Sequence, residues 1–469
     1  MTFLALIIVT YCVAILALAA MNRSGELSLD DYLVAGRNMG LGLSTVTLFG
    51  TWFGAGTLLA AADEVAKEGL FPIAAEPLGA GLALIFAGIF FARPLWRAQL
   101  LTLADFFRLR YGRLVEVMFS ITVLTYFGWI AAQLVGIAGI LNVFFGTPIW
   151  FGILATAAFA MIYTSLGGMW SVAKTDTIQV FFVVLGLVCL MFAIAQQYGD
   201  VGTMWHQLSP EKRHWLGGEE AGALLKWTKL LAIGSLGNVC GSDLMQRVFA
   251  ARSEKIAQKS CIIAGVLYMS IGALPVMVGL YGAAYLPSPE LGSIIANFIA
   301  SMLQSETASW WFYPAFSCMI LALFSAVLST LDSGMLTAAS VLGQNVFGPL
   351  SRGGNSKALV KRCLYLTTVI SLIFAFLGED AFSLLEGSYA LSMAGPLVPL
   401  SIGLYTKFGG QWAASTSLFL GFGSVLYEAT CETVWLPFTA IPLPVPLAGL
   451  GLSLFGYIVV GFVEERRVL

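Results

Sequence analysis

Long apolar stretches separated by short polar connections run through this sequence. About thirteen of them reach about 20 residues, and at ~1.5 Å of rise per residue a helix of that length crosses the ~30 Å hydrocarbon core of a bilayer. The pattern therefore predicts an all-α integral membrane protein with about 13 transmembrane helices. The expected crossings are residues 2–21, 42–62, 70–92, 115–144, 148–166, 173–197, 225–245, 260–285, 309–345, 358–378, 381–404, 408–428 and 438–463.

Basic residues are distributed unevenly among the connections between these stretches. When the connections are taken alternately, one set holds 19 of the 24 Lys and Arg residues, Arg247 among them. The positive-inside rule assigns that set to the cytoplasm. We therefore expect a multi-pass protein of the plasma membrane whose N-terminus lies outside and whose C-terminus lies inside, which requires an odd number of crossings.

Composition supports a membrane protein and disfavours several other classes. Hydrophobic residues make up 58% of the chain and charged residues only 11%, and the mean hydropathy is +0.86. A net charge of −2 offers no basic surface for nucleic acid. The only histidines, His206 and His214, fall in one connection, and the seven cysteines show no CxxC spacing. We expect neither an enzyme nor a His- or Cys-based metal centre.

Two crossings are richer in glycine and polar atoms than a lipid-facing helix should be, namely residues 45–57 and 234–243. Unwound backbone inside a bilayer is tolerated only where protein buries it or where it lines a cavity. Both crossings are therefore candidate broken helices. The alternative is that the glycines only permit close helix packing.

The two candidate breaks lie five crossings apart. Units of five helices, residues 41–197 and 225–404, would each begin with a broken helix, and an odd number of helices gives the units opposite orientations. This arrangement is the LeuT-like inverted repeat of secondary transporters, with a binding site near the membrane midplane. Residues 1–469 then form a single transporter domain in which 2–21, 408–428 and 438–463 are peripheral helices.

Three sequence runs carry a resemblance to a known family. They are residues 167–179 (GGMWSVAKTDTIQ), 246–253 (QRVFAARS) and 326–340 (AVLSTLDSGMLTAAS). Together they resemble the sodium:solute symporter family, which also has thirteen crossings. The resemblance implies a symporter that uses co-transported Na+ to import a small organic solute.

Ser329 and Thr330 are adjacent hydroxyls deep in an apolar stretch. A lone membrane hydroxyl often bonds back to the carbonyl one turn earlier. Beside a broken helix, however, hydroxyls and freed carbonyls can replace the water around a hard cation. The resemblance places a first Na+ between these two hydroxyls and the carbonyls of Ala326, Gly50 and Phe53.

Asp176 and Asp332 are carboxylates inside expected membrane helices, where each costs roughly 2.5 to 3.5 kcal/mol on insertion scales. Asp332 shares a helical face with Ser329, and Ser333 lies one turn from both Ser329 and Thr330. In some family members an aspartate at the position of Asp176, with hydroxyls at positions that match Ser329 and Ser333, forms a second Na+ site that this pattern resembles. We therefore expect Asp176, Asp332 and Ser333 to be candidate ligands of a second Na+. The alternative is a carboxylate that pairs with a basic residue or caps a helix.

Aromatic residues near the first break suggest the solute. Trp52 and Trp129 match positions that surround a quaternary ammonium in the choline-transporter-like branch of the family, where cation–π attraction contributes roughly 0.5 to 2 kcal/mol per contact. Two other walls of that cage are missing, because Ala80 and Gly241 stand where the branch has aromatic residues. The sequence thus favours a quaternary amine such as choline only weakly over an amino acid, a sugar or an organic acid.

Other polar groups leave the solute and the coupling ion open. Gln133 is a candidate solute ligand, as are Asn238 and Asp243, whereas Glu76 and Glu386 fit structural pairs. Proton coupling through an aspartate, or a solute sensor that kept the transporter fold, are alternatives to Na+ symport. The sequence does not say whether the protein acts as a monomer or an oligomer.

Overall fold

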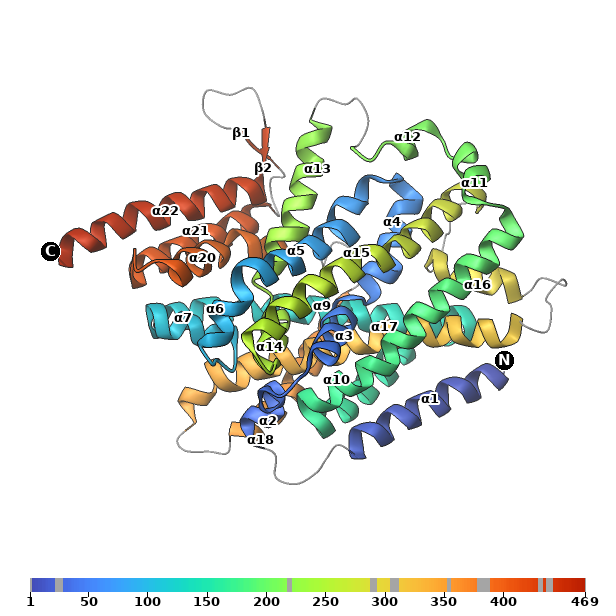
Figure 1. The fold of residues 1–469 in the computed structure, drawn as a ribbon, viewed down its shortest axis with the longest axis horizontal. Helices are drawn as coiled ribbons and strands as arrows, with labels where there is room; N and C mark the ends of the chain where they lie inside the picture. The colour runs from blue at the N-terminus through green and yellow to red at the C-terminus, as the bar shows by residue number, and fades with distance from the viewer. Residues whose placement is uncertain are drawn as a thin grey trace.

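The computed structural model is almost entirely helical (Figure 1). Among the described residues it departs from the all-α expectation in a short antiparallel pair of strands, β1 (Thr433–Trp435) with β2 (Pro442–Pro444). The structure describes residues 2–21, 28–216, 222–286, 293–303, 312–351, 356–377, 389–428, 433–435 and 442–468.

The α-helices in chain order are α1 (Thr2–Met21), α2 (Leu29–Val34), α3 (Leu41–Trp52), α4 (Ala61–Glu68), α5 (Ala80–Phe86), α6 (Ala92–Arg97), α7 (Leu103–Tyr111), α8 (Arg113–Ser120), α9 (Val123–Phe145), α10 (Ile149–Tyr198), α11 (Val201–Gln207), α12 (Pro210–Arg213), α13 (Ala223–Ala232), α14 (Ser242–Ala250), α15 (Glu254–Tyr285), α16 (Ile294–Leu303), α17 (Phe312–Val341), α18 (Ser356–Leu377), α20 (Leu397–Tyr405), α21 (Gln411–Glu428) and α22 (Val445–Val468). Several are extended by π-turns at Gly56–Ala60, Ala75–Gly79, Ala87–Phe91, Ile233–Gly237 and Leu342–Val346. Short 3₁₀ turns lie at Ala35–Arg37, Phe71–Ala74 and Gly348–Leu350.

Eight helical segments in the described ranges are long and apolar enough to cross a membrane, and a bent pair of helices raises the number to nine. This confirms a multi-pass membrane protein, whereas the finer count of thirteen stays a prediction. The expected crossings 148–166 and 173–197 join into the single helix α10, with a bend at Gly168. The expected crossing 381–404 begins outside the described residues.

Both expected helix interruptions are present. α3 ends at Trp52, Phe53 has non-helical angles (φ −80°, ψ 63°), and the chain resumes as a helix at Gly56 with a bend of 59°. The second interruption follows the π-turn Ile233–Gly237, where Gly241 is extended (φ −59°, ψ 120°) before α14 begins. Each break frees backbone groups from helical hydrogen bonding in the interior of the protein.

Gly168 shows why α10 can bend. Its φ of +59° is one that L side chains rarely adopt, and a Cβ there would lie 2.6 Å from the carbonyl oxygen of Tyr32. Only glycine fits this conformation and this close approach. The glycine run that carries the family resemblance is therefore a bend packed against α2.

The helices that surround the two breaks form the centre of the molecule. α10 packs against α17, α9 and α3, while α15 packs against α3, α4 and α5. At the edges, α1 lies along α10, and α21 and α22 pair with each other at the opposite end (Figure 1). The polar side chains of α3, α14 and α17 consequently face one another in an apolar surrounding.

Candidate ion and solute sites

The break after α3 lies against the middle of α17. The hydroxyl of Thr330 is 3.4 Å from the carbonyl oxygen of Gly50 and 3.2 Å from that of Ala326. The neighbouring hydroxyl of Ser329 donates to Oδ1 of Asp176 at 2.5 Å. Both hydroxyls are buried. The structure thus brings four of the five residues predicted for the first Na+ into one polar cluster.

Glycines allow this close approach between the two helices. A Cβ on Gly50 would lie 2.9 Å from the hydroxyl of Ser329, and a Cβ on Gly54 would collide with the side chain of Thr330. Phe53, the fifth predicted ligand, is the first non-helical residue of the break, directly before Gly54. Whether these oxygens bind Na+ stays a prediction.

The residues predicted for a second ion lie beside the first cluster. Asp176 accepts hydrogen bonds from Ser329 and Thr47, which links α10 to α17 and α3. Asp332 accepts a bond from Ser333 at 3.3 Å on Oδ1, and the side chain of Tyr163 is a further hydrogen-bonding neighbour of this carboxylate. Its Oδ2 is buried and has no well-formed hydrogen bond in the part of the chain that the structure describes. A buried carboxylate oxygen without a partner is costly unless a cation neutralises it.

Arg247 lies inside the protein, although the charge pattern counts it among the residues of a cytoplasmic connection. Its side chain is fully buried, not placed in a cytoplasmic connection, because α14 restarts inside the protein after the break at Gly241. The guanidinium donates to the hydroxyl of Ser333 at 2.5 Å and to the backbone oxygen of Asp243 at 3.1 Å. A buried positive charge thus stands next to the two buried aspartates.

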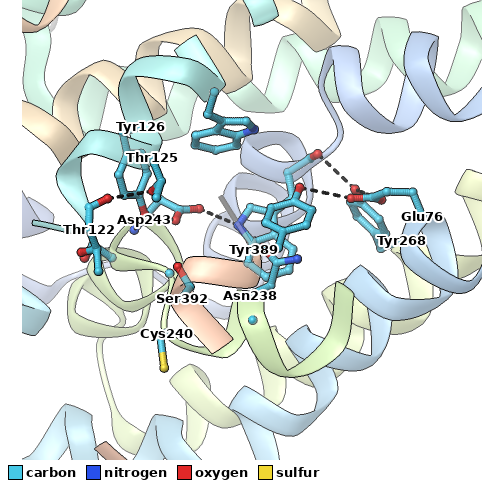
Figure 2. Close-up of a pocket in the computed structure, with 15 residues that line it drawn as sticks. Glu76, Thr122, Thr125, Tyr126, Asn238, Cys240, Asp243, Tyr268, Tyr389 and Ser392 are labelled. Carbon is cyan, nitrogen blue, oxygen red and sulfur yellow. Dashed lines mark hydrogen bonds between the residues drawn. The ribbon is translucent and has the colours of Figure 1, made fainter. Parts of the chain in front are cut away.

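A pocket opens between the two breaks, and the space within it, open solvent included, is about 550 Å³ (Figure 2). Aromatic side chains form much of its wall, two carboxylates belong to it, and none of the described residues that line it is Lys, Arg or His. The lining consists of Trp52, Glu76, Thr122, Thr125, Tyr126, Trp129, Gly237, Asn238, Cys240, Gly241, Ser242, Asp243, Tyr268, Tyr389 and Ser392.

One end of the cavity is organised by Asp243, the second residue of α14. The indole N–H of Trp52 donates to its Oδ2 and the hydroxyl of Tyr126 donates to its Oδ1, each at 2.5 Å. The ring of Tyr126 also meets that of Trp129 edge-on, with centroids 5.6 Å apart. The carboxylate therefore fixes the side chains of Trp52 and Tyr126. The ring of Tyr126 in turn supports that of Trp129.

Glu76 lies at the other end of the cavity (Figure 2). Its Oε2 accepts bonds from Thr57 and Tyr268 at 2.9 Å, and its Oε1 accepts from Tyr389 at 3.3 Å. The hydroxyl of Tyr268 also lies 3.1 Å from the carbonyl oxygen of Trp52 at the break. Hydroxyls, not a basic residue, are the described partners of Glu76, while Glu386 lies outside the described residues.

The solute residues predicted from sequence are not all in one place. Trp52 and Trp129 line the cavity together, as expected. Gln133 does not line it; its side-chain oxygen accepts a bond from the amide of Ala55 at 2.8 Å and so satisfies backbone freed by the break. Sequence reasoning missed Tyr268 and Tyr389, because single tyrosines in apolar helices give no signal that separates a wall from ordinary packing.

The profile of the sodium:solute symporter family matches residues 32–384. The chain belongs to the sodium:solute symporter family. This confirms the resemblance that the three sequence runs carry. Among its curated relatives, the high affinity choline transporter 1 of Homo sapiens is 29% identical over 344 residues, which are 70% of this chain and 57% of the relative. The high-affinity choline transporter 1 of Drosophila melanogaster is 26% identical, with 80% and 61% covered.

The chain spans less than two thirds of the length of these choline transporters. It covers 94% of the osmoregulated proline transporter OpuE of Bacillus subtilis (strain 168), at 23% identity over 97% of its own length. A solved Na+-coupled sialic acid symporter matches with a TM-score of 0.80 at 17% identity, over 98% of both chains. The nucleobase-cation-symport-1 transporter Mhp1 matches with a TM-score of 0.60 at 12% identity, over 94% of this chain and 96% of its own. These structures establish the LeuT fold.

Proposed function

We propose that this protein is a sodium-coupled symporter that imports a small organic solute by alternating access. The observation that carries the proposal is the contact between the Thr330 hydroxyl on α17 and the Gly50 carbonyl at the end of α3. Oxygens from two helices converge there beside interrupted backbone, which is how secondary transporters of this fold class coordinate Na+. Membership of the symporter family supports the same role.

The first Na+ binds between the two helices. Its ligands are the hydroxyls of Ser329 and Thr330 and the carbonyls of Gly50, Phe53 and Ala326. These ligands are neutral, so the ion brings one positive charge into the membrane and the membrane potential contributes ~2.3 kcal/mol per 100 mV to its inward movement. By joining α3 to α17, the ion stabilises the outward-open state to which the solute binds.

A second cation site is formed by Asp176, Asp332 and Ser333. Two ionised aspartates beside Arg247 leave one uncompensated negative charge, which a single monovalent cation neutralises. The oxygen of Asp332 that has no well-formed hydrogen bond among the described residues is available to that cation. Proton coupling is the competing assignment, because a proton on Asp332 neutralises the same charge.

The solute binds in the cavity between the breaks. Aromatic rings and carboxylates without a basic residue in the lining attract a small organic cation, and cation–π contacts contribute roughly 0.5 to 2 kcal/mol each. The choline transporters among the relatives agree with such a cation. Transport follows when residues 41–197 and 225–404, as two inverted repeats, rock about the occupied site in a plasma membrane with the N-terminus outside.

Uptake into proteoliposomes that contain the purified protein tests this function. We expect accumulation of an organic cation to require an inward Na+ gradient and to be abolished by Ser329→Ala or Thr330→Ala in protein that still elutes as a folded species. Uptake that persists in sodium-free buffer and rises as the external pH falls would instead establish proton coupling. Uptake unchanged by either substitution would contradict the proposed Na+ site.

A further inference from the structure

We infer that the solute is an organic cation with at least one N–H on its charged nitrogen, and that Asp243 is the residue that binds this N–H. The inference rests on the proposed function, because it concerns the solute of the same cavity. It follows from the acceptor capacity of Asp243, from the glycine next to it, and from the different surroundings of Glu76.

The carboxylate of Asp243 retains room for another donor. Each of its oxygens accepts one described hydrogen bond, from Trp52 or from Tyr126, although a carboxylate oxygen can accept about two. Arg247 bonds to the backbone oxygen of Asp243 and not to its carboxylate. In the described ranges Asp243 has no ion-pair partner, so its negative charge faces the cavity without a cation.

Gly241 keeps this carboxylate open to the cavity. A Cβ at position 241 would lie 2.9 Å from Oδ1 of Asp243 and 3.1 Å from the backbone oxygen of Asn238. The backbone angles of Gly241 (φ −59°, ψ 120°) suit any residue, so space and not conformation requires glycine here. A larger side chain would cover the carboxylate that the glycine leaves accessible.

The opposite carboxylate has less room for another donor. Glu76 already accepts bonds from Thr57, Tyr268 and Tyr389, and two of these converge on one oxygen. Only Oε1 of Glu76 keeps a place for another donor, whereas both oxygens of Asp243 do, so we assign the N–H to Asp243 and a purely electrostatic contribution to Glu76. Asp243 and Glu76 therefore differ in what they recognise, the first an N–H and the second only a positive charge.

An N–H gives the solute an interaction that a quaternary nitrogen lacks. Hydrogen bonds between charged partners are roughly twice as strong as neutral ones, and methyl groups hold a quaternary nitrogen away from the carboxylate. Aromatic walls alone favour each added methyl, because it buries more apolar surface. A preference for the less methylated cation is consequently a signature of the carboxylate and not of the aromatic walls.

Ethanolamine and its N-methyl, N,N-dimethyl and N,N,N-trimethyl derivatives test the inference, because their charge is constant while the number of N–H groups falls from three to zero. We would measure binding to the full-length protein by calorimetry, in sodium chloride and in potassium chloride. We expect the dimethyl compound to bind about tenfold more tightly than the trimethyl compound, a difference of about 1.4 kcal/mol. In Asp243→Asn protein, the dimethyl compound should bind no more than about threefold more tightly than the trimethyl compound.

Two further variants separate a binding role from a structural one. Gly241→Ala places a methyl group against Oδ1 of Asp243, so it should weaken binding of the N–H compounds more than binding of the trimethyl compound. Glu76→Gln should weaken all four compounds by a similar factor and preserve their order. If Asp243→Asn protein remains folded but its affinity for all four compounds falls by the same factor, Asp243 only holds the aromatic walls in place. That result would overturn the inference.

The outcomes also separate the inference from the proposed function. Sodium-dependent binding in which the trimethyl compound is the tightest ligand would retain the symporter and overturn the inference. The expected order in both sodium and potassium would retain the inference and overturn sodium coupling. If none of the four compounds binds, both the inference and the cation selectivity are wrong.

Discussion

Replacing Thr330 by valine removes one hydroxyl and keeps the shape of the side chain. The hydroxyl lies within 3.4 Å of the Gly50 carbonyl and 3.2 Å of the Ala326 carbonyl, and the side chain is buried. A buried polar contact to a charged partner contributes about 1.5 to 3 kcal/mol. Loss of this Na+ ligand should therefore weaken Na+ binding by about ten- to a hundredfold, because each 1.4 kcal/mol is about a factor of ten.

The melting temperature, measured at increasing sodium concentrations, reports this loss of Na+ affinity and does not require that the solute is known. A ligand that binds only the folded protein stabilises it by RT ln(1 + [L]/Kd), so weaker binding moves the rise in melting temperature to higher sodium. Potassium chloride at equal ionic strength controls for salt effects. Thr330→Ser, which keeps the hydroxyl, is the matched control and should follow the wild type to within about threefold.

In the absence of sodium, Thr330→Val should lower the free energy of unfolding by no more than about 1 to 3 kcal/mol, because the Ala326 carbonyl lies within helix α17 whereas the Gly50 carbonyl at the break loses its described partner. A Thr330→Val protein whose melting temperature responds to sodium at the same concentration as the wild type would refute the assignment of this hydroxyl to the ion. So would a Thr330→Ser protein that loses the response as completely as the valine variant.

Three further substitutions test other parts of the structure. Gly168→Ala should lower the free energy of unfolding by at least ~1 kcal/mol, because alanine is strained at a φ of +59° and its Cβ meets the Tyr32 carbonyl; an unchanged melting temperature would argue against the bend in α10. Cys240 lines the cavity, so a cationic methanethiosulfonate should block solute binding in the wild type and not in Cys240→Ser, and bound solute should slow the reaction. Equal inhibition of both proteins would show that Cys240 does not line the cavity. Trp52→Phe keeps an aromatic wall but loses the N–H bonded to Asp243, and should weaken solute binding by about three- to tenfold while sodium binding is unchanged; a loss of sodium binding would show that the indole supports the ion site instead.

Sequence alone located the parts of the site that violate the rules of a lipid-facing helix. The glycine-rich runs at 45–57 and 234–243 marked the two breaks, because glycine in an apolar stretch indicates either an interrupted helix or close helix packing. The hydroxyl pair at Ser329 and Thr330 marked the helix that faces the first break. Local composition is sufficient for such features because the signal and the structure lie in the same short segment.

Other features depend on contacts between distant parts of the chain. Tyr268 and Tyr389 donate hydrogen bonds to Glu76, although they lie 192 and 313 residues further along the chain. The sequence around each of the three residues does not indicate which residue it bonds to. Gln133 was predicted as a solute ligand, but it does not line the cavity, and the sequence does not show that its side-chain oxygen accepts a bond from the amide of Ala55. Arg247 was misplaced because charge counting assumes that basic residues lie outside the bilayer, and a helix that restarts inside the protein breaks that assumption.

Equilibrium binding of radioactive sodium to the purified protein tests the central claim most directly, since the claim is that the break after α3 and the hydroxyls of α17 together hold the coupling ion. We predict saturable binding to the wild type, and no saturable binding at the same sodium concentrations to a folded triple variant with Ser329→Ala, Thr330→Val and Asp176→Asn. Sodium binding of equal affinity and capacity in the wild type and in this variant would contradict the account.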